Sequence, residues 1–117
     1  MESFVRGRSY IHGSHTLKNH PTCGRDCGHF WEFTVLVAGE ELEARFGMAV
    51  DEVKLQNDLD DIRIELSGKN IDKMLKPSVS SPVGIAYWLQ GRLASKYDVR
   101  EVEVWRDQSV SALLKAP

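Results

Sequence analysis

The stretch HFWEFTVLV, residues 29–37, constrains the fold of this chain most, because its aromatic and β-branched residues predict a β-strand. Side chains alternate between the two faces of a strand, so every second residue shares one face. On one face of this strand lie Cys27, His29, Trp31, Phe33, Val35 and Val37. Such an apolar face needs a cover, so we expect it to pack on helices, with Cys27 and His29 at its end.

Two helices are predicted to provide that cover. Residues 51–66 place Leu55, Leu59, Ile62 and Leu66 on one stripe at helical spacing. A second helix is expected from Ser81-Pro82 to about residue 95, with proline in its first turn. Further strands are expected over residues 3–11, 99–106 and 109–115, and irregular chain over 12–28 and 69–80. This order predicts an α+β fold, a four-stranded antiparallel sheet with two helices on one face.

Length and charge limit the possible functions. A chain of 117 residues predicts a single domain over residues 1–117. The net charge of -2 offers no basic surface for nucleic acid. No apolar run approaches the roughly 18 residues that span a membrane, and the N-terminus has no apolar stretch like that of a signal peptide. We therefore expect a cytoplasmic protein, in which stable disulfides are rare.

The segment CGRDCGH, residues 23–29, contains both cysteines of the chain and one histidine. Cys27 and His29 could bind one zinc ion together if further ligands come from elsewhere. The preceding segment offers His12, His15, His20 and Cys23. Two other interpretations stay open on spacing alone. One is a core cysteine beside a hydrogen-bonded histidine, and the other is a disulfide between Cys23 and Cys27.

The same segments resemble a known family. IHGSHTL, residues 11–17, is similar to the family motif that carries the first zinc histidine, which places His15 in that role. CGRDCGH is similar to Cys-Gly-Arg-x-His-Gly-His, and GMAVD, residues 47–51, to the turn before the first helix. The family is that of 6-pyruvoyl-tetrahydropterin synthase and 6-carboxytetrahydropterin synthase, the latter acting in queuosine biosynthesis. The likeness spans nearly the whole chain.

The resemblance implies a fold, a cofactor and a reaction class. It implies the tunnelling fold, in which subunits join their sheets into a barrel, usually as a trimer or a hexamer. It implies zinc bound by His15, Cys27 and His29, with thiolate replacing imidazole at Cys27. It also implies a lyase that acts on a pterin-like small molecule, with Cys23 as the catalytic thiol.

Several positions depart from the family pattern. The catalytic Asp-His pair falls on Ser67 and Gly68, and the pterin-anchoring Glu-Thr falls on Arg106 and Asp107. Arginine only donates hydrogen bonds, so Arg106 suits a carboxylate, phosphate or carbonyl-rich ligand, unless it is simply a surface charge. Asp107 would face the opposite way on a regular strand, and could replace the glutamate only across a bulge. Two functions therefore remain: a zinc-dependent lyase, and a non-catalytic protein whose structural zinc site is closed by Cys23.

Overall fold

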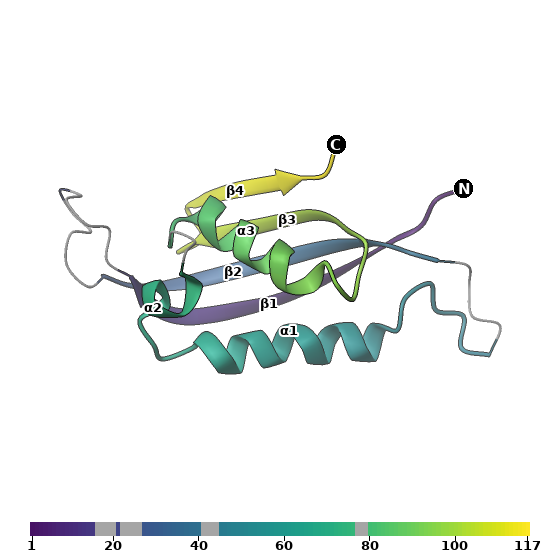
Figure 1. Ribbon diagram of the computed structural model, residues 1–117, viewed down its shortest axis with the longest axis horizontal. Coiled ribbons are helices and arrows are strands. Elements are labelled where there is room, and N and C mark those ends of the chain that lie inside the picture. The colour runs from purple at the N-terminus through teal and green to yellow at the C-terminus, as the bar shows by residue number, and fades with distance from the viewer. Residues whose placement is uncertain (16–20, 22–26, 41–44, 77–79) are drawn as a thin grey trace.

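The computed structural model describes residues 1–15, 21, 27–40, 45–76 and 80–117, apart from the side chain of Cys27. One antiparallel sheet runs through the molecule in the order β1-β2-β3-β4 (Figure 1). Its strands are β1 (Phe4–His15), β2 (Cys27–Ala38), β3 (Val99–Arg106) and β4 (Val110–Lys115). The helices α1 (Glu52–Leu66), α2 (Ile71–Leu75) and α3 (Pro82–Leu93) lie on one face of it. The predicted α+β architecture is confirmed.

The core lies between the sheet and the two long helices. Trp31, Phe33, Val35 and Val37 are all fully buried, as the alternation along β2 predicted. They meet the apolar stripes of the helices, which consist of Leu55, Leu59, Ile62 and Leu66 on α1 and Ile85, Ala86, Leu89 and Leu93 on α3. This core fixes which way the side chains at the end of β2 point.

Both long helices begin where the sequence predicted. The side chain of Asp51 accepts a hydrogen bond from the Lys54 N–H at 3.1 Å, and Ser81 accepts one from the Gly84 N–H at 3.1 Å. Each cap satisfies an N–H group that has no partner within its helix and typically contributes about 1 kcal/mol. No helix in the described part of the chain is long and apolar enough to cross a membrane.

The first strand is longer than the sequence predicted. We expected it to end at residue 11, but β1 continues to His15, which pairs with Cys27 at the start of β2. The outer edge of this extension is occupied by another segment. The Gly68 N–H donates to the His12 carbonyl at 2.6 Å, and the Ser14 N–H donates to the Lys69 carbonyl at 3.1 Å. These long-range bonds sustain a strand that local residue preferences do not indicate.

A short helix occupies part of the predicted irregular segment 69–80. α2 begins after Asn70, whose side chain accepts a hydrogen bond from the Asp72 N–H at 3.0 Å. It buries Ile71 and Leu75 against the end of β1. Gly13 permits this approach, because a β-carbon there would lie 2.7 Å from Cγ2 of Ile71. The expectation of only two helices was therefore incomplete.

Candidate metal-binding and active site

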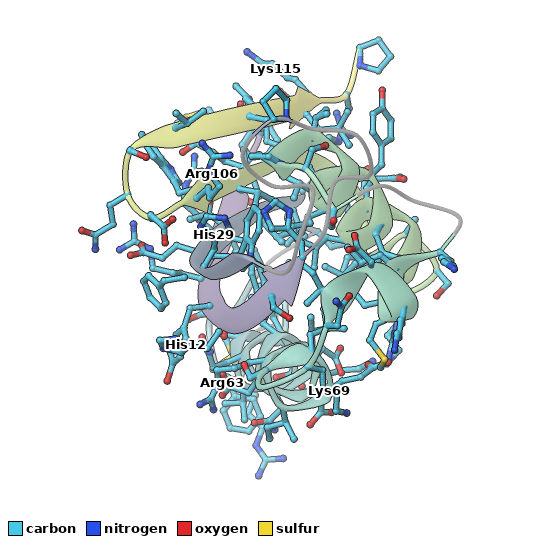
Figure 2. All side chains as sticks on the ribbon, turned by 90° about the vertical axis from the view of Figure 1, so that its left-hand side faces the viewer. His12, His29, Arg63, Lys69, Arg106 and Lys115 are labelled. Carbon is cyan, nitrogen blue, oxygen red and sulfur yellow. The ribbon has the colours of Figure 1, made fainter. Side chains whose placement is uncertain are left out.

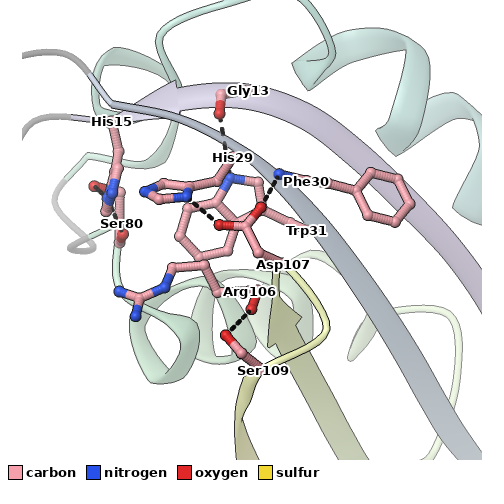
Figure 3. Close-up of polar contacts among 9 residues, drawn as sticks. All are labelled: Gly13, His15, His29, Phe30, Trp31, Ser80, Arg106, Asp107 and Ser109. Carbon is pink, nitrogen blue, oxygen red and sulfur yellow. Dashed lines mark hydrogen bonds and ion pairs between the residues drawn. The ribbon is translucent and has the colours of Figure 1, made fainter.

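Two of the predicted metal ligands lie together at the end of the sheet where β1 ends and β2 begins. The ring centroids of His15 and His29 are 4.7 Å apart, and the ring planes are inclined by 73° (Figure 3). Both rings pack edge-on against Trp31, whose indole N–H donates to the Gly13 carbonyl at 3.3 Å. The longer β1 is what brings His15 to this position. The sequence could suggest the pair but not this contact.

His15 is fully buried and is oriented by the main chain before α3. Its Nδ1 lies 2.8 Å from the carbonyl oxygen of Ser80, which can only accept, so Nδ1 carries the proton. Burial lowers the pKa of His15, and so do the charges of His29 and Arg106, although the Ser80 hydrogen bond and the charge of Asp72 oppose the shift. His15 is therefore a neutral imidazole whose Nε2 carries a lone pair.

His29 is oriented by a carboxylate from the end of β3. Its Nδ1 lies 2.5 Å from Oδ2 of Asp107, and Oδ1 of Asp107 accepts a hydrogen bond from the Phe30 N–H at 2.9 Å. Burial alone would raise the pKa of Asp107, but the hydrogen bonds from Phe30 and His29 outweigh it and hold the pKa below its usual value. An ionised carboxylate accepts only, so Nδ1 of His29 is the donor, and in the neutral imidazole Nε2 then carries the lone pair.

The two remaining imidazole nitrogens are the unusual feature of this site. Nε2 of His15 and Nε2 of His29 are both buried, and neither has a hydrogen-bond partner among the described residues. One ring nitrogen of His29 points toward Asp107 and the other toward His15 (Figure 3). Buried polar atoms without partners are rare and typically cost about 1–3 kcal/mol each. Such a neutral nitrogen, with its ring fixed through the opposite nitrogen, is the usual form of a histidine metal ligand.

Of the other candidate ligands, only His12 lies with its side chain among the described residues. The thiol of Cys27, all of Cys23 and all of His20 lie outside the described residues. His12 is exposed and contacts Tyr10 and Phe30 instead, with ring centroids 5.7 and 4.8 Å away. Within the described part of the chain, no three His, Cys, Asp or Glu side chains are grouped so that they could hold a metal. The two imidazoles fit two of the three predicted zinc ligands, and Cys27 as the third ligand stays a prediction.

The role of Asp107 was missed by the sequence analysis. We reasoned that it would face away from the site on a regular strand, but β3 ends at Arg106 and Asp107 begins a turn. Asp107 and Gln108 have φ angles of 49° and 61°, in the left-handed region. Aspartate tolerates this region better than most residues do. An Asp directly after an alternating strand was the one available signal for this turn.

Arg106 lies beside the two histidines. It is half-buried, and its positive charge is one of the causes that lower the pKa of His15. In a view onto this end of the molecule, Arg106 is next to His29, whereas Lys69 and Arg63 lie nearer α1 (Figure 2). The position agrees with a group that contacts a ligand near the imidazoles, although the role of Arg106 stays a prediction.

A cavity of about 500 Å³ opens next to His29. Its lining includes His12 of β1, Phe30 of β2, Asp107 after β3 and Lys69 before α2, but neither His15 nor Arg106. A larger cavity, of about 610 Å³, is lined by residues 38–40, 46, 48–51, 54 and 96–98 and by none of the candidate site residues. Of the two cavities, only the smaller one is lined by a predicted zinc ligand, His29, and Arg106 lies outside the lining of both.

The positions that replace the family's catalytic pair contain no base. Oγ of Ser67 accepts a weak hydrogen bond from the His12 N–H at 3.4 Å, and Gly68 contacts the same residue through its backbone. An acid does lie nearby, because the Ser80 hydroxyl donates to the Asp72 carboxylate, whose charge also acts on His15. Neither Ser80 nor Asp72 was singled out from the sequence. The role of Ser80 depends on its backbone carbonyl, which no residue pattern in the sequence indicates.

Comparisons with known proteins agree with the fold described above. Residues 5–116 match the family model of 6-pyruvoyl tetrahydropterin synthase. The structure superimposes on Caenorhabditis elegans 6-pyruvoyl tetrahydropterin synthase with a TM-score of 0.84 and 18% identity, covering 100% of this chain and 97% of the other. It also superimposes on an uncharacterized Wolinella succinogenes protein with a TM-score of 0.80 and 14% identity, covering 100% and 99%. A search of the curated proteins found no match.

Proposed function

Because the chain belongs to the 6-pyruvoyl tetrahydropterin synthase family, we propose that it is a zinc-dependent lyase acting on a pterin or a related compound. In this proposal His15, Cys27 and His29 bind the zinc ion, Cys23 is the catalytic thiol and Arg106 contacts the substrate. The active form is a trimer or a hexamer.

The proposal depends mainly on one observation, the two buried Nε2 atoms that have no partner among the described residues. A core histidine would place this second nitrogen against a hydrogen-bond donor or water. Here each ring is fixed through Nδ1, by the Ser80 carbonyl and by Asp107, and each keeps its Nε2 lone pair inside the protein. Zinc accepts such nitrogens, and a thiolate such as that of Cys27 is an equally good ligand.

The residues around His15 and His29 have different roles in the proposed reaction. Zinc, when bound, supplies a Lewis acid that stabilises negative charge developing on a substrate oxygen. Arg106 donates hydrogen bonds to an anionic or carbonyl-bearing part of the substrate. Cys23 removes and returns a proton, and Arg25, two residues further along the sequence, favours the thiolate. Burial around Trp31 and His15 keeps water away from the ligand nitrogens.

A second function is favoured by a specific observation. Ser67 and Gly68 provide no acid-base group where the family has its catalytic pair. A protein that has lost this pair could retain zinc only for stability, with Cys23 closing a four-ligand site. The two functions differ in one respect, which is whether the fourth position on zinc is a thiol or is open.

Replacing Cys23 with alanine separates these functions. In the lyase, Cys23→Ala abolishes turnover while zinc content and melting temperature stay at the wild-type values. In the structural protein, the same change removes a ligand, so zinc affinity and stability fall together. Cys27→Ala is the matched control, because it removes a ligand in both cases. A Cys27→Ala variant that retains zinc as tightly as wild type would reject the ligand set.

A further inference from the structure

Asp107 makes two hydrogen bonds that only a carboxylate can make together. Its Oδ2 accepts from Nδ1 of His29 at 2.5 Å, and its Oδ1 accepts from the Phe30 N–H at 2.9 Å. The Phe30 N–H is a backbone group and can only donate. One oxygen is therefore committed to the main chain, and the other faces the imidazole.

From this geometry we propose that Asp107 is a positioning residue that fixes the tautomer of His29, with the proton on Nδ1 and the lone pair on Nε2. The inference rests on the proposed function in so far as Nε2 then binds zinc. It assigns a role to a residue that does not touch the metal. An acidic partner of this kind both orients a histidine ligand and increases its basicity.

The backbone around Asp107 supports this role. The Asp107 N–H donates to the Phe30 carbonyl at 2.8 Å, and the Asp107 side chain accepts from the Phe30 N–H. Asp107 therefore binds both backbone polar groups of Phe30. Asp107 makes this double contact from the turn between β3 and β4, in which Asp107 and Gln108 have left-handed φ angles of 49° and 61°. Non-glycine residues rarely adopt this conformation, and when they do they cluster at functional sites. The turn aims the carboxylate at His29 without any help from a metal.

Replacing Asp107 with asparagine tests whether the carboxylate orients the His29 ring or only fills space beside it. Asn has nearly the same shape and tolerates the left-handed region, so the turn is preserved. Its one oxygen cannot accept from both Phe30 and His29. If that oxygen stays on the Phe30 N–H, the amide N–H₂ faces Nδ1 and donates to it, which moves the ring proton to Nε2. A protonated Nε2 cannot bind a metal.

The tautomer can be measured directly in the zinc-free protein by two-dimensional NMR of ¹⁵N-labelled imidazoles. We expect His29 of the wild type to carry its proton on Nδ1, and His29 of Asp107→Asn to carry it on Nε2. A wild-type protein with the proton on Nε2 would overturn the inference, and this readout does not depend on whether any variant folds. Gln108→Asn is the matched control, since it keeps the turn and leaves the carboxylate in place. The tautomer should not change in this control.

Zinc affinity provides the second readout, measured by competition with a chromogenic chelator. Loss of an outer partner typically weakens metal binding by about 10–100-fold, and we expect this for Asp107→Asn but not for Gln108→Asn. Equal affinity of wild type and Asp107→Asn, with an unchanged tautomer, would refute the role of Asp107 while leaving the proposed function intact. Absence of zinc binding in the wild type would instead reject the proposed function, and the tautomer would then decide the inference alone.

Discussion

Replacing His15 with leucine should remove zinc binding without unfolding the zinc-free protein. Leucine has a similar volume, and position 15 is fully buried at the edge of the apolar core. The change removes the Nε2 atom that has no partner, which relieves about 1–3 kcal/mol of desolvation. It also leaves the Ser80 carbonyl without its Nδ1 donor, which costs a similar amount. The two effects nearly cancel, so the free energy of unfolding should change by less than about 2 kcal/mol.

The effect of zinc on the melting temperature should distinguish wild type from His15→Leu clearly. A ligand present at 100 times its dissociation constant stabilises the native state by about 2.7 kcal/mol. With an unfolding entropy of about 2.1 cal/mol/K per residue, this raises the melting temperature of a chain of 117 residues by about 10 °C. Wild type should show this increase on adding zinc to the chelator-treated protein, and His15→Leu should show almost none.

Thermal unfolding followed by circular dichroism, with and without zinc, is the assay. His12→Leu is the matched control, because His12 lies three residues away on the same strand but is exposed and contacts Tyr10 and Phe30. The control should retain the full zinc-dependent increase. A full increase in His15→Leu, or its loss in His12→Leu, would show that we have assigned the wrong histidine.

Three further predictions concern other parts of the molecule. The Tyr97 hydroxyl donates to Asp58 at 2.6 Å and lowers its pKa, so Tyr97→Phe should cost about 1–2 kcal/mol at pH 7. Because the pKa of Asp58 is lower in the folded state, the stability that this hydrogen bond contributes is present above pH 4 and is lost as pH falls below about 4. If urea titrations showed that Tyr97→Phe lowers the free energy of unfolding equally at pH 7 and at pH 3, they would contradict this prediction. Sedimentation should show a trimer or a hexamer, because β1 and β4 leave sheet edges that closure into a barrel would pair, and a stable monomer would count against this. With no base at Ser67 or Gly68, turnover of dihydroneopterin triphosphate should be far below 1 per second, and a rate of about 1 per second or more would prove this wrong.

Periodicity predicted the parts of the fold that local residue patterns control. The alternation along β2 and the apolar stripe of α1 identified the buried face correctly, because burial depends directly on side-chain direction. The end of β1 and the helix α2 were missed, because both depend on long-range contacts. The backbone bonds from Gly68 and Lys69 extend β1, and no local residue preference encodes them.

The site was predicted only in part for a related reason. His15 and His29 could be selected as ligands from the sequence, but the groups that orient them could not. Ser80 acts through its backbone carbonyl, which every residue has. Asp107 was assigned to the wrong face because strand alternation was extended one residue past the end of β3. Cys23 stays a prediction, since it lies outside the described residues.

X-ray absorption at the zinc edge, on protein purified without added zinc, tests the central claim most directly. It reports whether the metal is present and which atoms surround it. We predict about one zinc per chain, with imidazole nitrogens at about 2.0–2.1 Å and at least one sulfur at about 2.3 Å. His29→Ala should remove most of the metal. A protein that contains no zinc, or a zinc ion without histidine nitrogen around it, would contradict the assignment of the two buried Nε2 atoms as metal ligands.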